Sequence, residues 1–179
     1  MSIGAGRAAR LGAFRGLAAG LLLLLAALPA RAGDLKVTVA GLRSDAGTLM
    51  IGLYDSADGF DLAIKHSSEG GLLNDRGRLV GAAMRAAPGA RSIIFTQLPP
   101  GHYAVIAFHD ENDDGRLDES PWGVPLEGYA FSNDAQGLLA APSFEAASFA
   151  VDEEGNDVTL TLIYPKATEP GPPPSQGLE

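Results

Sequence analysis

Hydrophobic and polar side chains alternate along most of the chain between residues 35 and 165, and Gly, Pro, Asn and Asp interrupt the alternation at short intervals. A period of two places successive side chains on opposite faces of an extended backbone, so the pattern predicts β-strands. The predicted strands cover residues 35–39, 48–55, 78–86, 91–98, 103–108, 149–152 and 158–165. The run YAVIAF is apolar on both faces, which is typical of a central strand covered on each side.

About seven strands joined by turns predict an all-β protein, namely an antiparallel β-sandwich of the immunoglobulin-like or transthyretin-like type. Two longer connections, residues 56–77 and 110–145, interrupt the strands. Neither shows a clear helical period with capping residues, although the first has room for one short helix.

The two ends of the chain differ from this domain in composition. Residues 1–32 combine a basic start, an apolar run and the small-x-small sequence Ala30-Arg31-Ala32, which predict a cleavable export signal. The apolar run is shorter than the roughly 20 residues of a membrane-spanning helix, so we expect a periplasmic or secreted product with no stable membrane span. We place the β-sandwich domain at residues 33–166 and predict a disordered, Pro-rich tail at 167–179.

Removal of the signal changes the charge of the protein. Residues 33–179 hold 9 basic and 22 acidic side chains, which give a net charge of −13. This excess repels phosphate backbones, which argues against nucleic acid as a partner and favours divalent cations or basic partners. The chain has no Cys, so its stability depends on its core and not on disulfides.

The densest polar segment is HDENDDGRLD, residues 109–118. From its first Asp onward it matches D-x-[DN]-x-[DN]-G, in which alternate residues supply oxygen ligands to calcium and Gly permits a sharp turn. We therefore predict a calcium site. Its predicted ligands are Asp110, Asn112, Asp114, the backbone carbonyl of Arg116, and Asp118.

The match ends at loop position twelve, where an EF-hand has a bidentate Glu and this chain has Pro121. The loop is therefore not an EF-hand, and Glu119, Glu127 or water remain alternatives for completing the ligand shell. A second interpretation is an Asx-rich turn, in which Asp and Asn side chains accept hydrogen bonds from the loop backbone. In either case Leu117 is placed to fix the loop to the core.

Catalytic motifs are absent from the sequence. His102 and His109 lie seven residues apart, which on one strand separates them by about 23 Å and places them on opposite faces, while His66 is expected in an exposed loop. We assign no catalytic residue. A pair of carboxylates in the 110–127 region could hydrolyse an envelope glycan, and this hydrolase is the alternative function.

Aromatic residues gather after the acidic loop, in PWGVPLEGYAFSND, residues 121–134. Trp122, Tyr129 and Phe131, with Glu127, are candidates for a surface that binds an envelope protein or carbohydrate. The alternative, which we favour for the aromatic side chains, is that they pack the long connection onto the open end of the sandwich.

Four segments together resemble a known family. They are LPPGHYAVIAFHDENDDGRLD, WGVPLEGYAFSND, APSFEAASFAV and VTLTLIYP, and over residues 35–164 they are similar to bacterial exported proteins grouped as domain of unknown function 2141. The resemblance implies export and the domain limits, but no reaction. The shared positions are Gly101, Tyr103, His109, Asp110, Asn112, Gly115, Asp118, Glu127, Gly128, Phe131, Ser132 and Asn133, with Ala130 standing where Gly is expected.

A weaker likeness concerns the motif G-x-Y-x-V followed by D-x-N-x-D-G. It is similar to calcium-binding repeat modules of Gram-positive surface adhesins, which are also sandwiches, and it implies calcium by analogy. Taken together, these observations favour an exported, non-catalytic β-sandwich that acts in binding or interaction at the cell envelope.

The export signal generates the first prediction. Expression with all 179 residues should yield a product that begins at Gly33, because Ala30 and Ala32 supply the small side chains that a signal peptidase requires. Intact-mass measurement of the exported protein checks this. A product that retains residues before Gly33 would refute the assignment.

Overall fold

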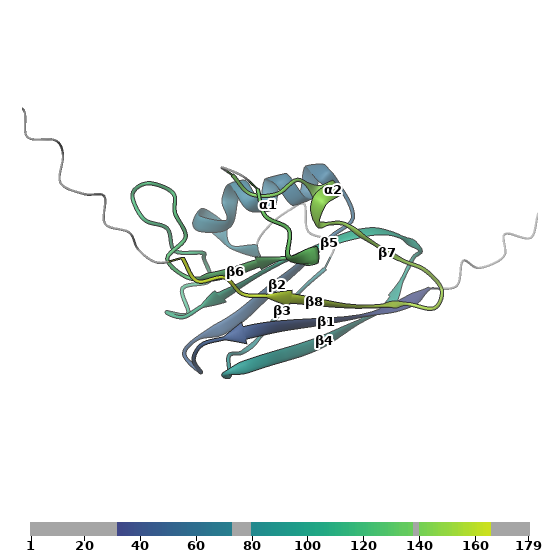
Figure 1. Cartoon of the computed structure of the whole chain (residues 1–179), viewed down its shortest axis with the longest axis horizontal. Helices are drawn as coiled ribbons and strands as arrows, with labels where there is room; N and C mark the ends of the chain where they lie inside the picture. Colours follow the sequence, from purple (N-terminus) through teal and green to yellow (C-terminus); the bar gives the residue numbers. More distant parts are fainter. Residues whose placement is uncertain (1–31, 73–79, 138–139, 166–179) are drawn as a thin grey trace, which may run out of the picture.

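The structure is a computed structural model that describes residues 32–72, 80–137 and 140–165 (Figure 1). Its strands form two sheets, which confirms the predicted all-β, sandwich-like class. The predicted signal, apart from Ala32, and the predicted tail lie outside the described residues. The limits proposed for the domain, 33 and 166, therefore stay predictions.

Eight strands occur in the described residues. They are β1 (Gly33–Leu42), β2 (Thr48–Tyr54), β3 (Val80–Arg85), β4 (Gly89–Leu98), β5 (Gly101–Asp110), β6 (Gly128–Phe131), β7 (Phe149–Val151) and β8 (Asn156–Thr161). One sheet has the order β4-β1-β8, and the other has the order β3-β2-β5-β6, with β7 paired to the start of β5. The predicted strands are all present, and β6 is an additional strand within the connection predicted at 110–145.

Strand pairing is antiparallel except between β1 and β8, which run parallel from Leu35 beside Asn156 to Ala40 beside Thr161. This pair departs from the purely antiparallel sandwich that we predicted. After β8, the backbone of Ile163 exchanges two hydrogen bonds with Tyr129 of β6, at 2.9 and 3.0 Å. The two sheets are therefore joined along this side of the sandwich.

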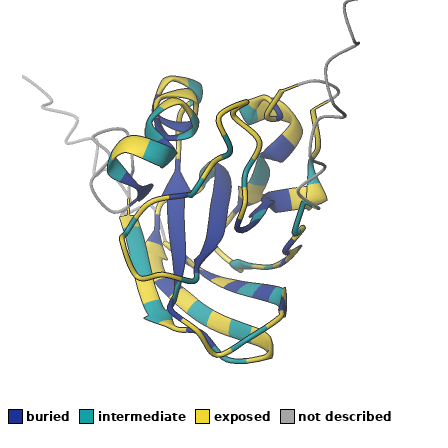
Figure 2. Ribbon diagram, turned by 90° about the vertical axis from the view of Figure 1, so that its left-hand side faces the viewer, coloured by how far each residue is buried: buried dark blue, intermediate teal, exposed yellow. Residues whose placement is uncertain are grey.

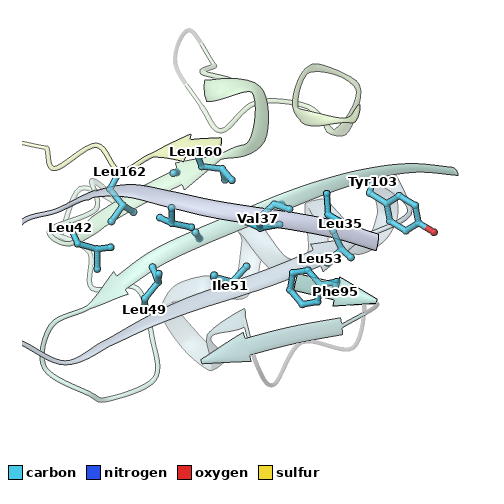
Figure 3. Close-up of a cluster of buried hydrophobic side chains, with 14 of the residues drawn as sticks. Leu35, Val37, Leu42, Leu49, Ile51, Leu53, Phe95, Tyr103, Leu160 and Leu162 are labelled. Carbon is cyan, nitrogen blue, oxygen red and sulfur yellow. The ribbon is translucent and has the colours of Figure 1, made fainter. Parts of the chain in front are cut away.

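The main core lies between the two sheets (Figure 3). Alternate residues of β1, namely Leu35, Val37 and Val39, face Leu49, Ile51 and Leu53 of β2, and all six are fully buried. The intervening residues of β1 are exposed or half-buried, as the alternating sequence predicts. Burial of this apolar surface is the main favourable contribution to folding.

The five-stranded sheet is apolar on its outer face as well. In Figure 2 its central strands are dark blue along their length, because almost every residue of β2 and β5 is buried. The outer face is covered by α1 (Ala57–Gly70) and α2 (Phe144–Ala147), which lie on the opposite side of this sheet from β1 and β4 (Figure 1). A short 3₁₀ helix, η2 (Ser132–Asp134), follows β6 directly.

Helix α1 is longer and better capped than the sequence suggested. The Oγ of Ser56 accepts a hydrogen bond from Gly59 N–H at 3.4 Å, which caps the helix N-terminus. Phe60 and Ala63 are buried against the sheet, and the rings of Phe60 and Tyr54 meet edge to face at 5.9 Å. Few residues of α1 are buried against the sheet, so few of its positions need to be apolar, which explains why the helical period of the sequence is weak.

No helix among the described residues is both long enough and apolar enough to cross a membrane.

Candidate functional site

The acidic loop begins where the central strand ends. Asp110 is the last residue of β5 and is 1% exposed. Its two carboxylate oxygens accept hydrogen bonds from the backbone N–H groups of Asp114, at 3.1 Å, and Gly115, at 2.8 Å. Gly115 has a φ of +81°, which a side chain would strain. Asp110 thus folds the chain back on itself directly after the strand.

The other predicted ligands continue this turn. The Oδ1 atom of Asn112 accepts a hydrogen bond from Asp114 N–H at 3.0 Å, and the Oδ1 of Asp114 accepts one from Arg116 N–H at 2.9 Å. The amide of Asn112 also donates to Asp118 Oδ2 at 3.1 Å. These are the side chain to backbone hydrogen bonds expected of an Asx-rich turn.

Glu127 joins the two ends of the acidic loop. It is buried, with one oxygen accepting a hydrogen bond from Glu111 N–H at 2.7 Å and the other from Asp118 N–H at 3.1 Å. Leu117 is also buried, and its N–H donates to the carbonyl of Ser67 on α1 at 3.0 Å. Leu117 therefore fixes the loop to the core as predicted. Glu127 holds the backbone of Glu111 and that of Asp118 together across the loop.

The two buried carboxylates lie in an unfavourable electrostatic environment. Burial raises the pKa of Asp110 and of Glu127, and the backbone N–H groups that they accept from lower both pKa values in part. Neighbouring carboxylates oppose the ionisation of each acid further, among them Asp114 beside Asp110 and Asp118 beside Glu127. The site therefore accumulates negative charge, which backbone amide dipoles offset in part.

The residue types of the loop fit calcium, which prefers carboxylate, amide and carbonyl oxygens. In the described part of the chain, however, no three His, Asp or Glu side chains converge on one point closely enough to hold a metal ion. The exposed side chains of Asn112 and Asp114 and the half-buried Asp118 would have to turn toward Asp110 to do so. Calcium therefore remains a prediction.

Glu111 points the other way and joins a second polar cluster. Its carboxylate pairs with Arg43, which lowers the pKa of Glu111, and Arg43 stacks over the ring of Tyr164 at 4.3 Å. The hydroxyl of Tyr164 lies 2.7 Å from His109 Nδ1, and His109 Nε2 lies 2.7 Å from the carbonyl of Ala46. Because a carbonyl only accepts, Nε2 of His109 donates to Ala46 O, and in the neutral imidazole Nδ1 then accepts from the Tyr164 hydroxyl.

A cavity of about 390 Å³ opens between α1, the outer face of the five-stranded sheet and the connections that follow the acidic loop. Its floor consists of Ile106 and Phe108 of β5 with Tyr129 and Phe131 of β6. The remaining walls come from α1 and from two segments of the connections. The wall residues are Ile64, Ser67, Leu117, Glu119, Gly123, Val124, Pro125, Ala135, Gln136, Gly137, Ala140, Ala141 and Pro142.

A tight turn at residues 119–125 forms one rim of this cavity. Glu119 and Pro125 pair across it, Ser120 N–H donates to the carbonyl of Val124 at 2.8 Å, and Gly123 N–H donates to the carbonyl of Ser120 at 2.9 Å. Trp122 lies in this turn and is 74% exposed, the highest value among the exposed large hydrophobic residues described. The turn thus leaves the largest apolar side chain of the chain in solvent, while the two residues that follow it line the cavity.

The predicted aromatic surface is therefore divided by the structure. Phe131 packs against Phe60, with 5.9 Å between ring centroids, and Tyr129 is half-buried beside Phe131. Phe131 and Tyr129 therefore pack the connection onto the sheet, which is the alternative that we favoured, whereas Trp122 lies in solvent. Glu127, which was included in the candidate surface, lies beneath the surface and braces the loop. No pattern in the sequence indicates that Tyr129 and Phe131 line a cavity.

The positions of the histidines and carboxylates do not favour hydrolysis. His66 lies on α1, and not in a loop as expected, and contacts Glu69 at 3.0 Å, while His109 is fully buried and hydrogen-bonded. Glycoside hydrolysis requires two carboxyl groups on either side of the scissile bond. Among the residues that line the cavity, Glu119 supplies one carboxylate, and the buried Asp110 is not among them.

Several residues that carry the family likeness hold the connections in place. The Oγ of Ser132 accepts from Val105 N–H at 2.9 Å and donates to the carbonyl of Ala147 at 2.6 Å. The side chain of Asn133 donates to Ser148 O at 2.8 Å, and its own φ is +61°. These hydrogen bonds fix α2 against the five-stranded sheet, beside the cavity.

The chain belongs to a family described as an uncharacterized protein conserved in bacteria, domain of unknown function 2141, whose model matches residues 37–159. The match covers most of the described domain and confirms the family resemblance. Comparison with curated proteins and with solved structures gave no match.

The brace formed by Glu127 generates the second prediction. Glu127→Gln keeps the size of the side chain but turns an amide NH₂ toward a backbone N–H, so one buried donor loses its acceptor. We expect the free energy of unfolding to fall by about 1–3 kcal/mol. Urea denaturation measures the change, with the exposed Glu153→Gln as the matched control. Equal stability of the two variants would show that Glu127 does not hold the loop.

Proposed function

We propose that this protein is an exported, non-catalytic binding module that holds the apolar part of a small ligand in the cavity beneath the Trp122 turn, at the cell envelope. The observation that carries the proposal is a cavity of about 390 Å³, lined mainly by apolar residues that include Gly123 and Val124, which directly follow the exposed Trp122. Export is supported by the N-terminal sequence, as described above.

The size of the cavity limits what it can hold. Ligand sites have volumes of roughly 300–1,000 Å³, so a cavity of about 390 Å³ suits an aromatic ring or a short alkyl segment better than a whole lipid. Its floor of Ile106, Phe108, Tyr129 and Phe131 has one polar side chain, that of Tyr129, which favours a mainly apolar group over a sugar. Filling the cavity would remove apolar surface from water on both partners.

The exposure of Trp122 supports the same function. Trp side chains bury a large area and are enriched where proteins bind their partners, so an exposed Trp on a hydrogen-bonded turn is well placed to contact a ligand. Val124 of the same turn is 44% exposed and also lines the cavity. The turn is held by its own backbone hydrogen bonds, which reduces the entropy lost on binding.

The third prediction tests the cavity with octanol, a neutral ligand with a short alkyl chain. Trp122 is the one Trp of the chain, so octanol should change its fluorescence in a saturable manner. Ala135→Phe places a ring in the cavity and should weaken binding at least tenfold, whereas Ala90→Phe on exposed β4 should not. Absence of saturable binding by the unmodified protein would contradict the proposed function, whether or not Ala135→Phe folds.

We also propose that calcium stabilises the acidic loop, with Asp110, Asn112, Asp114, the carbonyl of Arg116 and Asp118 as ligands. The density of oxygen ligands and the burial of Asp110 among other acids support this proposal. Binding of a divalent cation would offset the repulsion among these carboxylates. The loop would then hold the Trp122 turn more firmly, since Asp118 directly precedes it.

The fourth prediction concerns this metal. Millimolar calcium should raise the melting temperature of residues 33–179, because a cation that binds the folded state alone stabilises it. Asp110→Ala combined with Asp114→Ala should abolish the rise, while the exposed Asp152→Ala with Glu154→Ala should retain it. Calorimetry of the unmodified protein with and without calcium provides the measurement, and identical melting curves would exclude the metal.

A further inference from the structure

We propose that the cavity selects ligands that carry a cationic group beside their apolar part, so that its ligand is a small cationic amphiphile. This inference rests on the proposed function and adds the chemical class of the ligand. It follows from the distribution of charge around the cavity and from the exposure of Trp122 in the turn that contributes to its lining.

The cavity carries a single charged side chain among its described lining residues, and that side chain is acidic. It is Glu119, which lies in the Trp122 turn and is exposed. The other polar side chains of the lining, Ser67, Tyr129 and Gln136, are neutral. A ligand whose apolar end enters the cavity would therefore have Glu119 near its polar end. A cation would be attracted there and a carboxylate repelled.

The surrounding connection strengthens this preference. Residues 110–137 contain eight acidic residues and one basic residue, Arg116. Two of these acids are paired with Arg side chains from elsewhere, Glu111 with Arg43 and Asp113 with Arg85 at 3.8 Å. The balance within this connection remains negative, which concentrates cations and disfavours anions at low salt.

Helix α1, which forms another wall of the cavity, does not reverse this balance. Its exposed Lys65 opposes the acidic field, and His66 is already paired with Glu69. The same helix also carries the acidic residues Asp58 and Asp61, so it contributes no net positive charge.

Trp122 gives an independent reason to expect a cation. The face of an indole ring attracts ammonium groups, and Trp is the strongest aromatic partner in such contacts. Trp122 is 74% exposed and lies three residues from Glu119 in the same hydrogen-bonded turn. Trp122 is not itself among the lining residues, but Gly123 and Val124, which follow it, are, so an ammonium group near Glu119 would lie by a turn that carries an exposed indole.

The test compares three ligands with the same alkyl chain and different head groups, namely octyltrimethylammonium, octanol and octanoate. Isothermal calorimetry on residues 33–179 at low salt should show octyltrimethylammonium binding about three- to tenfold more tightly than octanol, and octanoate more weakly than octanol. Raising the salt to about 1 M should reduce the difference, because a Debye length of about 3 Å screens the rim.

Two variants separate the contributions of the rim. Glu119→Gln and Trp122→Leu should each lower the ratio of octyltrimethylammonium affinity to octanol affinity, both measured on the same variant. Glu153→Gln, an exposed substitution outside the cavity lining, is the control for a general change in net charge. Melting curves identify any variant that fails to fold, in which case the three-ligand comparison on the unmodified protein decides.

The outcomes distinguish the two proposals. If none of the three ligands binds, the proposed function fails and this inference fails with it. If octanol and octanoate bind as tightly as octyltrimethylammonium at low salt, the cavity binds apolar groups without selecting for charge. That result would overturn the inference while leaving the proposed function in place.

Discussion

The burial of the five-stranded sheet on both faces is the constraint on which the rest of the structure depends. Along β5, Tyr103, Val105 and Ala107 face the interior of the sandwich, while Ile106 and Phe108 belong to the second core beneath α1. A sheet with two apolar faces needs cover on each side. The β4-β1-β8 sheet covers one face, and α1, α2 and the connection after β5 cover the other, with the cavity between them.

The same arrangement explains why buried polar groups gather at the end of β5. The strand brings His109 and Asp110 to the edge of two apolar layers, where buried polar groups must be hydrogen-bonded. His109 is held by Tyr164 and Ala46, and Asp110 by the backbone that follows it. These hydrogen bonds position the connection that forms the rim of the cavity. The connection is acidic because the side chains that form its turn are mostly Asp and Glu.

The strands whose residues alternate between apolar and polar could be predicted from the sequence. The alternating pattern identified β1, β2 and β5, and the apolar character of YAVIAF correctly indicated a strand covered on both faces. It did not identify β6, a four-residue strand, or α1, whose helical pattern is weak because few of its residues are buried. The cavity was not predictable, since it depends on how segments distant in the sequence pack. Nor did the sequence distinguish the buried Phe131 from the exposed Trp122, because both are aromatic residues of the same connection.

The central claim is that the cavity beneath the Trp122 turn is a binding site for an apolar group. Intermolecular nuclear Overhauser effects between octyltrimethylammonium and the methyl groups of the domain test it most directly. The account predicts contacts from the alkyl chain to Ile64, Ile106 and Leu117, which line the cavity, and none to Ile94, which is 58% exposed on the opposite sheet. Contacts to Ile94 without contacts to the cavity methyl groups would contradict it.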